Sequence, residues 1–429
     1  MPSTVLTFKA DVHPGRRGDL KETLAELHES VGKRGCPPFG GIESLHFASL
    51  TVFDTPGFPT VLVFENDFDG ELEPYLNELV GAAAPWIHRL FSCATDYRVQ
   101  DGTRRAEMAD YLKAHVLRPA AYHIGNVGRS VRRIRRESRL REDLAGRIDA
   151  GLQAPPRPTT ADECYDFVHG EMDRAGGYAW VKDEPHVRET PSERNTPRRR
   201  LHWTLIAFMA LFVALLVLSW RATLIGVAVL VIVLLLHEAF ERPMKPTELD
   251  PDHARRLAER EDQLVQNHLA SMTVVKWGPF RRLLLRVVLW AANLVARTST
   301  DGTLSGIPSI HFAHWSLLDR GRRLLFLSNF DGSWENYLDD FVDKASPGLT
   351  GIWSNTVGFP RTWLLAAFGG SRDGVAFKAF ARQNQIRADV WYSAYPTLTV
   401  NQIDNQSTLR EGLASRPARP DLGSWLRHW

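Results

Sequence analysis

The sequence contains few cysteines, and none of them stands in a recognisable motif. Cys36, Cys93 and Cys164 are the three cysteines among 429 residues, and they lie far apart. They form no CxxC pair, so there is no support for a zinc site or for a disulfide framework. We therefore expect a protein of a reducing compartment, and the sequence predicts no metal site.

Several signatures of known activities are also missing. The chain has no GxGxxG, GxxxxGK[ST], HExxH, GxSxG or CxxCH motif, which argues against nucleotide-dependent and the best-known hydrolytic functions. A net charge of +2 creates no whole-molecule field toward nucleic acid, so no nucleic-acid partner is expected. Residues 1–12 carry no basic start followed by an apolar core, so no signal peptide is predicted.

The sequence does contain one pattern that is written twice. The tripeptide HFA occurs at His46–Ala48 and again at His311–Ala313. The motif FDGxxExYL follows each copy, within DFDGELEPYL at Asp67–Leu76 and within NFDGSWENYL at Asn329–Leu338. The order is the same, and the spacing differs by only three residues. Two halves of the chain are therefore expected to share one fold.

Hydrophobic periodicity predicts the same element order in both halves. Strand, helix, strand, strand, helix and strand are expected in the first half at Thr4–Val12, Asp19–Val31, Ser44–Phe53, Thr60–Glu65, Glu71–Phe91 and Leu117–Ile124. In the second half they are expected at Leu269–Lys276, Phe280–Arg297, Ser309–Leu318, Arg323–Asn329, Trp334–Val342 and Val390–Tyr395. This order is the split βαβ pattern of ferredoxin-like folds.

The chain resembles the dimeric α+β barrel superfamily, in a form in which two copies are fused. The resemblance covers residues 1–128 and 264–404, and it rests on the element order and the repeated pattern. It implies an α+β fold in which two ferredoxin-like repeats form a pseudo-dimeric α+β barrel. We expect a transmembrane helical hairpin to be inserted between the repeats.

A membrane-length apolar block separates the two copies. From Trp203 to Leu236 the sequence has a single charge, Arg221. One helix of that length, at ~1.5 Å per residue, reaches ~50 Å, well beyond a ~30 Å hydrocarbon core. Two helices that turn at Ser219–Arg221 are each roughly 15 to 17 residues long, at the lower edge of spanning length. A hairpin over residues 201–238 is the preferred interpretation, and one long span is the alternative.

Basic residues stand on both sides of this block. Arg198, Arg199 and Arg200 precede it, and Arg242 and Lys245 follow it. Basic flanks favour the cytoplasmic side. We therefore expect a protein integral to the cell membrane, with both soluble repeats in the cytoplasm, as a pseudo-dimer requires.

The remaining segments are expected to connect these parts. Residues 129–200 are predicted to form a basic helix and a polar linker, 239–263 a connector, and 405–429 a loose C-terminal tail. The basic helix has eight arginines from Arg129 to Arg147, a composition typical of helices that bind anionic lipid surfaces. RNA is the alternative partner, but the aromatic residues on which bases stack are not interleaved with these arginines.

His46 and His311 are candidate catalytic and cofactor-binding residues. Strand alternation predicts that both point into the barrel interior, with Phe47 and Phe312 on the opposite face. Imidazole ligates metals and transfers protons near neutral pH. The alternative is a structural role, in which each histidine is half-buried and bonded to a backbone carbonyl.

Asp69 and Asp331 also have two interpretations. Each ends a strand and precedes a helix, where a carboxylate can cap the free N–H groups of that helix. The other interpretation makes them acid–base groups above the barrel cavity, and it comes from a resemblance to dye-decolourising peroxidases, which use an aspartate before a glycine above haem. That resemblance implies haem as the candidate cofactor and Arg118 and Arg387 as accompanying arginines. The proximal histidine of that family has no assignable equivalent in this chain.

Two functions are therefore compatible with the sequence. One is a membrane-bound redox enzyme or haem protein, similar to a peroxidase, that acts on a small apolar ligand in the barrel. The other is a non-catalytic membrane scaffold that recruits a soluble partner.

Overall fold

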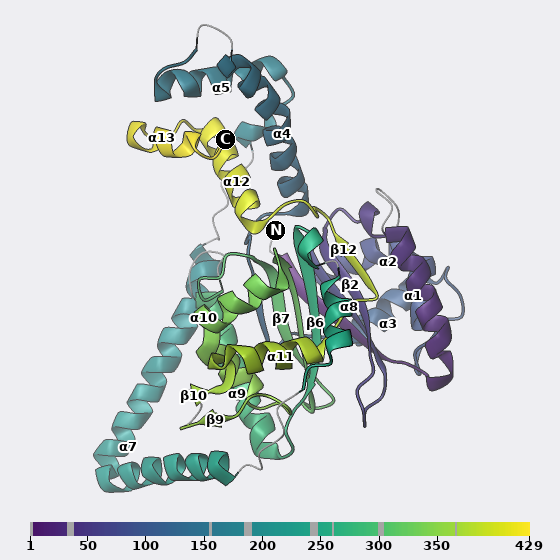
Figure 1. The fold of residues 1–429 in the computed structure, drawn as a ribbon, viewed down its shortest axis with the longest axis vertical. Coiled ribbons are helices and arrows are strands. Elements are labelled where there is room, and N and C mark those ends of the chain that lie inside the picture. Colours follow the sequence, from purple (N-terminus) through teal and green to yellow (C-terminus); the bar gives the residue numbers. More distant parts are fainter. Residues whose placement is uncertain are drawn as a thin grey trace.

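The computed structural model describes residues 3–31, 38–153, 157–183, 191–240, 248–259, 261–298, 304–364 and 367–429. The chain has an α+β fold built on two five-stranded antiparallel sheets, so the predicted fold class is confirmed at this level. In Figure 1 the sheets lie at the centre with helices on their outer sides, a group of helices stands above them, and a long bent helix runs down one side.

The first sheet has the strand order β12-β2-β3-β1-β4. Its strands are β1 (Ser3–Asp11), β2 (Leu45–Phe53), β3 (Val61–Asp69), β4 (Val116–Leu117) and β12 (Val390–Ser393). Its outer face is covered by α1 (Arg17–Val31), α2 (Leu72–Phe91) and α3 (Arg105–Ala114). Along β3, Leu62 and Phe64 pack toward these helices, whereas Val63 points to the second sheet. Strand alternation thus gives each face of the sheet its own core.

The second sheet has the corresponding strand order β11-β6-β8-β7-β5. Its strands are β5 (Ala121–Ile124), β6 (Gln266–Val274), β7 (Ile310–Leu318), β8 (Arg323–Asp331) and β11 (Gln385–Ile386). Its outer face is covered by α9 (Pro279–Thr298), α10 (Trp334–Trp353) and α11 (Gly374–Asn384). α10 continues through Pro347, beyond its predicted end. Burial of Phe341 and Trp353 in this core stabilises the helix on both sides of the proline.

The two halves of the chain exchange their last strands. β5 pairs with β7 of the second sheet, with Ala121 opposite Trp315. β12 returns to the first sheet and pairs with β2, with Val390 opposite Leu50. The single strand predicted over Leu117–Ile124 is therefore wrong, because β4 and β5 belong to different sheets. Neither sheet is complete without a strand from the other half.

The inner faces of the two sheets pack against each other, and the side chains between them form three zones along the strands. One end is apolar and draws on both sheets, through Phe53, Val61, Val63, Ala270, Met272, Leu318, Leu325 and Leu327. The other end is aromatic and includes Phe47, Phe312 and Tyr395. Between them lie buried polar side chains, among them Glu65 and Asn329. The space between the sheets is thus occupied by side chains that contact each other from both sides.

The helical group in the upper part of Figure 1 is built from the segment that follows the first half of the chain and from the C-terminal end of the chain. It consists of α4 (Val131–Gln153), α5 (Ala161–Ala175), α6 (Trp180–Asp183), α12 (Val400–Ala414) and α13 (Arg419–Leu426). Leu144, Tyr165, Leu413 and Trp425 share its core. The prediction of a loose tail over residues 405–429 is therefore wrong. Pro420 lies in the first turn of α13, where the missing N–H costs little, so it starts the helix.

A buried ion network joins α4 to α12. The Glu137 carboxylate oxygen Oε1 lies 2.7 Å from Arg133 Nε and 3.2 Å from Arg410 Nε. The three side chains are at most 4% exposed. Part of the predicted basic helix is thus turned inward, because Arg133 pairs with Glu137 and Arg129 pairs with Asp404. The exposed arginines of this segment include Arg132, Arg139 and Arg147.

The apolar block lies in α7 (Pro191–Phe240), which is not one straight helix. Ser219 has φ −163° and ψ 88°, outside the helical region, and the two arms on either side of it diverge in Figure 1. The break coincides with the turn predicted from the sequence. Among the described residues, the segment His202–Leu236 is long and apolar enough to be a candidate for crossing a membrane. The predicted flanking residues Arg242 and Lys245 lie outside the described part of the chain.

The remaining short elements connect or extend these parts. They are α8 (Pro251–Ala258), the hairpin of β9 (Thr362–Trp363) and β10 (Phe368–Gly369), and the 3₁₀ turns Pro14–Arg16, Phe39–Gly41, Glu261–Gln263 and Gly370–Arg372. The hairpin is joined to the end of α7, because Thr362 Oγ1 donates a 2.7 Å hydrogen bond to Glu238 Oε1.

Replacing Glu137 by alanine is expected to destabilise the protein by about 3–5 kcal/mol, because two guanidinium groups lose a buried carboxylate. Urea unfolding of the full chain in detergent measures this change. Asp149→Ala, an exposed acid on the same helix, is the control and should stay within about 0.5 kcal/mol of wild type. Equal stability of the two variants would show that the network does not hold α4 to α12.

Candidate functional site between the sheets

The structure brings four of the predicted site residues together as two buried pairs. His46 Nε2 lies 3.0 Å from Asp69 Oδ1, and His311 Nε2 lies 2.7 Å from Asp331 Oδ1. The side chains are nearly inaccessible, with the most exposed of the four, Asp331, at 11%. Each pair belongs to one sheet, and the two pairs occupy corresponding positions near the ends of their strands.

A bulge in each strand changes the expected direction of the side chains. The pairing register shifts between Leu45 and Phe47 on β2, and the same shift occurs on β7. The His46 ring lies 5.3 Å from that of Phe312, and the Phe47 ring lies 5.2 Å from that of His311. The prediction that the phenylalanines face away from the histidines is therefore wrong, because a bulge places successive side chains on one side.

Asp69 and Asp331 cap helices, but not the helices that follow them in sequence. Asp69 Oδ2 accepts a 2.8 Å hydrogen bond from the backbone N–H of Val131 in the first turn of α4. Asp331 Oδ2 accepts a 2.7 Å bond from the backbone N–H of Val400 in the first turn of α12. The expected caps on α2 and α10 are wrong, since α2 has no side-chain cap and Ser333 caps α10.

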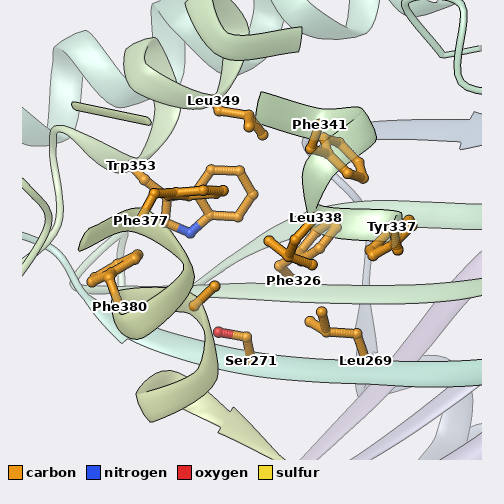
Figure 2. Close-up of a pocket in the computed structure, with 11 residues that line it drawn as sticks. Leu269, Ser271, Phe326, Tyr337, Leu338, Phe341, Leu349, Trp353, Phe377 and Phe380 are labelled. Carbon is orange, nitrogen blue, oxygen red and sulfur yellow. The ribbon is translucent and has the colours of Figure 1, made fainter. Parts of the chain in front are cut away.

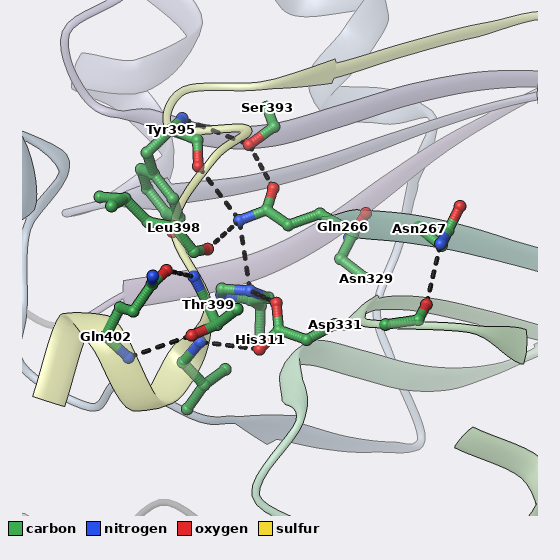
Figure 3. A network of polar contacts seen from close by, with 12 residues as sticks. Gln266, Asn267, His311, Asn329, Asp331, Ser393, Tyr395, Leu398, Thr399 and Gln402 are labelled. Carbon is green, nitrogen blue, oxygen red and sulfur yellow. Dashed lines mark hydrogen bonds and ion pairs between the residues drawn. The ribbon is translucent and has the colours of Figure 1, made fainter. Parts of the chain in front are cut away.

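The two pairs differ in their third partner. Tyr395 Oη lies 2.7 Å from His46 Nδ1. Burial raises the pKa of Tyr395 well above its usual range, with further contributions from nearby carboxylates, so the phenol stays protonated. Beside His311 stands Gln266, whose Nε2 lies 3.3 Å from His311 Nε2 and donates to the carbonyl of Tyr395 at 3.1 Å, as Figure 3 shows.

These contacts do not fit haem binding at His46. Both ring nitrogens of His46 are engaged, and the rings of Phe47 and Tyr395 pack beside it at a centroid separation of 5.4 Å from each other. Arg118 and Arg387 directly follow β4 and β11, and both are exposed, whereas the aspartates are not. The structure therefore does not unite the arginines with the His–Asp pairs.

A pocket lies elsewhere, on the outer face of the second sheet under α10 and α11 (Figure 2). Its volume is about 30 Å³, and aromatic side chains such as Phe326, Trp353, Phe377 and Phe380 line it. Ligand pockets typically measure ~300–1,000 Å³. This space is a packing gap between aromatic rings, and it does not have the size that the predicted small apolar ligand needs.

A second polar group occupies the middle of the inter-sheet space, and we call it the inter-sheet cluster. It consists of Glu65, Asp67, His268, His314 and Asn329. Glu65 Oε2 lies 2.8 Å from His268 Nε2, and Glu65 Oε1 lies 3.8 Å from His314 Nδ1. Asn329 Nδ2 donates to Glu65 Oε1 at 3.3 Å and to Asp67 Oδ2 at 3.1 Å. The cluster therefore links both sheets through charged and polar contacts.

Three further side chains hold the cluster from outside. Ser49 Oγ donates to Glu65 at 2.7 Å, and Thr7 Oγ1 lies 2.9 Å from His314 Nε2. Trp391, on the exchanged strand β12, donates its indole N–H to Asn329 Oδ1 at 2.9 Å. The arrangement consequently depends on the strand exchange as well as on the pairing of the sheets.

Burial and mutual proximity shift the ionisation of the cluster. Burial raises the pKa of Asp67 well above its usual range, and the charge of Glu65 raises it further. Burial also acts to raise the pKa of Glu65, but the charge and hydrogen bond of His268 outweigh this and lower it. Burial lowers the pKa of His314 to about 4. His314 is therefore a neutral imidazole near pH 7.

Sequence reasoning missed this cluster, although part of the signal was present. Glu65 and Asp67 stand two residues apart on β3, so they share one face of a strand that is buried along its whole length. His314 follows His311 by three residues on β7. The relation between these positions appears only when the two sheets are placed face to face. One donor atom each from Glu65, Asp67 and His314 lies within 4.8 Å of the other two.

Asp69→Ala is expected to lower the free energy of unfolding by about 0.5–2 kcal/mol, because α4 loses its cap. Amide hydrogen exchange should quicken in the first turn of α4 and stay unchanged in α2. Asp69→Asn keeps a capping oxygen and should lose less. Glu71→Ala, at the start of α2 where no side-chain cap exists, is the matched control; faster exchange in α2 rather than α4 on Asp69→Ala would contradict this assignment.

Acidification should weaken the wild-type protein more than His314→Gln. The pKa of histidine is about 6.5 when unfolded and about 4 for His314 in the fold, so the unfolded chain binds the extra proton as pH falls from 6.5 to 4. Stability is lost across that window, by about 3 kcal/mol at ~1.4 kcal/mol per pKa unit. The raised pKa of Asp67 has the opposite effect on the pH dependence of stability. Asp67 is present in both proteins, so the comparison isolates the contribution of His314. Urea unfolding at a series of pH values measures the difference, and parallel curves would contradict the prediction.

The His–Asp pairs and the inter-sheet cluster are thus the two groups of ionisable side chains on which a function of this core can be argued. Comparisons with protein-family models, curated proteins and solved structures find no match to this chain. Function must therefore be argued from the geometry of the molecule itself.

Proposed function

We propose that the protein is a membrane-anchored, non-catalytic module in which two ferredoxin-like repeats form one paired-sheet domain. α7 holds this domain at the cytoplasmic face of the bilayer as a helical hairpin. The resemblance to a fused dimeric α+β barrel is part of the proposal, and the shared element order and face-to-face sheets support it.

The observation that carries the proposal is the strand exchange. β5 precedes α7 and completes the second sheet, while β12 follows α7 and completes the first. The chain before α7 and the chain after it are therefore parts of one folded body. A membrane segment between them must leave the bilayer on the side where it entered, which a single crossing cannot do. The interruption of α7 at Ser219 supports a return at that point.

Exposed apolar side chains next to α7 support contact with the bilayer. α7 contacts α9, and α9 with the loop before it presents Trp277, Leu283, Val287 and Trp290 to the outside. The β9–β10 hairpin, bonded to the end of α7, adds Trp363, Leu364 and Phe368. Tryptophan is enriched at membrane–water interfaces, so these surfaces extend the apolar area of α7.

The His–Asp pairs support a scaffold rather than an enzyme. Asp69 and Asp331 each accept a backbone N–H and hold a histidine, so their oxygens have structural tasks. Contact of anionic lipid with Arg129–Arg147 has less support, because several of these arginines bond to protein groups and α4 stands at the opposite end of Figure 1 from the bend of α7.

Cysteine accessibility tests the topology of α7. In a chain without its three natural cysteines, Glu22→Cys and Asn336→Cys, exposed in the two halves, should react with a membrane-impermeant maleimide only after cells are permeabilised. Ala222→Cys, beside the bend, should react in intact cells, because a hairpin carries it across.

Complete reaction of all three variants in detergent is the control for accessibility. Labelling of the two halves from opposite sides would contradict both the hairpin and the single paired-sheet domain. Labelling of Ala222→Cys from the same side as the halves would contradict a spanning hairpin and indicate a segment that lies in the interface.

A further inference from the structure

We propose that Glu65, Asp67 and His314 bind one divalent first-row transition-metal ion between the two sheets. This proposal is independent of the membrane anchor, because the three residues lie in the core of the paired sheets. Glu65 and Asp67 share the inner face of β3, and His314 lies on β7 of the other sheet. The ion would therefore connect the sheets directly.

The separation of the donor atoms fits an ion better than a direct contact. One donor atom from each of the three residues lies within 4.8 Å of the other two. Glu65 Oε1 and His314 Nδ1 are 3.8 Å apart, too far for a hydrogen bond. Two ligands that bind one ion at roughly 2.0–2.2 Å each can be separated by such a distance.

Asp67 and His314 each have one polar atom held by the protein and one left over. Asp67 Oδ2 accepts from Asn329, and His314 Nε2 contacts Thr7 Oγ1. Asp67 Oδ1 and His314 Nδ1 are buried and have no hydrogen-bond partner among the described residues. Metal sites have this pattern, in which outer partners orient each ligand and its second atom binds the ion.

Glu65 follows the same pattern. Ser49 and His268 hold its Oε2 at 2.7 and 2.8 Å. Its Oε1, on the side of His314, has one long contact, 3.3 Å from Asn329 Nδ2. The three ligand side chains are therefore positioned by Ser49, His268, Asn329 and Thr7 before any ion arrives.

The charges of the inter-sheet cluster also call for a cation. The carboxylates of Glu65 and Asp67 are both fully buried and lie next to each other in the inter-sheet cluster. A proton on His314 Nε2 leaves the Nδ1 lone pair facing Glu65, and a proton on Nδ1 finds no acceptor at hydrogen-bonding distance. A divalent ion accepts the Nδ1 lone pair of His314 and offsets the charge of the two buried carboxylates.

The donor set selects the class of ion. Two carboxylates and one imidazole suit Mn²⁺, Fe²⁺, Co²⁺ and Zn²⁺, whereas Mg²⁺ and Ca²⁺ prefer oxygen alone and Cu⁺ prefers sulfur. Three protein ligands leave further positions for water on the ion. The competing explanation is a proton on Asp67, which neutralises the pair but leaves His314 Nδ1 without a partner.

Metal analysis of the full-length protein in detergent tests the site. The chain is unfolded with guanidinium and a chelator, because the residues are buried, and is then refolded with Co²⁺, Mn²⁺ or Zn²⁺, or without metal. We expect one ion per chain, Co²⁺ visible bands of an oxygen–nitrogen site, and a raised thermal midpoint. Asp67→Asn and His314→Gln should bind more than tenfold more weakly.

The exposed pair His115 and Asp96, whose side chains are 2.9 Å apart, provides matched controls. Asp96→Asn and His115→Gln carry the same substitutions outside the cluster and should bind metal as wild type does. Wild type that folds in the presence of each metal ion and retains none would overturn the proposal in favour of the protonated cluster, and equal binding by all variants would place the ion elsewhere.

Crystals of the wild-type protein grown with Mn²⁺ or Zn²⁺ keep the proposal testable if the variants do not fold. The anomalous signal should lie between β3 and β7, within bonding distance of His314 Nδ1. A signal at any other position, or its absence in folded protein exposed to metal during folding, would overturn the assignment.

Discussion

Hydrogen bonding between β2 and β12, and between β7 and β5, is the interaction on which the rest of the structure depends. Each exchanged strand is followed by a helix whose first N–H is accepted by an aspartate of the sheet that the strand did not join: Asp69 for α4 and Asp331 for α12. The same aspartates hold His46 and His311. The sheet edges, the His–Asp pairs and the helical group are thus interdependent, because the same two aspartates bind the histidines and cap the helices that follow the exchanged strands.

The inter-sheet cluster is where the two halves differ most. When the two halves are aligned through their strand pairings, Glu65 corresponds to Leu327, Asp67 to Asn329, Ser49 to His314 and Thr7 to Ala270. The histidines and aspartates of the repeated motif, in contrast, are identical in both halves. Residues that maintain the shared architecture are alike in the two halves, whereas the polar group at the centre is assembled from positions that differ between them. A buried charged group is costly unless it is fully paired, so this difference between the halves needs a reason beyond packing.

The sequence predicted best those elements that periodicity defines locally. The strands Leu45–Phe53 and Arg323–Asp331 fall close to their expected places, and the α+β class follows from them. The sequence could not predict which sheet a strand joins when its pairing partner lies far away along the chain. The segment Leu117–Ile124 is apolar enough for one strand, but the choice of sheet for each end is made by β1 and β7.

The residue roles that were predicted wrongly or missed have the same cause, which is contact between residues far apart in the sequence. Asp69 is next to α2 in sequence but next to α4 in space, and the residues after 405 become ordered helix because Trp425 finds a core with α5. Glu65 and His314 belong to no motif and lie 249 positions apart in the sequence, so only the packing of one sheet on the other brings them together. The sequence pattern therefore identified residues that are repeated in both halves. It did not identify residues such as Glu65 and His314, which are not repeated and come together only in the folded protein.

The position of β12 near the end of the chain constrains how the protein is made. Until residues 390–393 leave the ribosome, the edge of β2 is an unpaired strand edge, a template for pairing with other chains. If α7 inserts as proposed, it does so while that edge is still open. A returning hairpin would then hold the nascent second half close to the waiting first sheet and so raise its effective concentration. Membrane insertion would in this way be a step in the folding of the paired-sheet domain, because it would bring the two halves of the chain together before β12 pairs with β2.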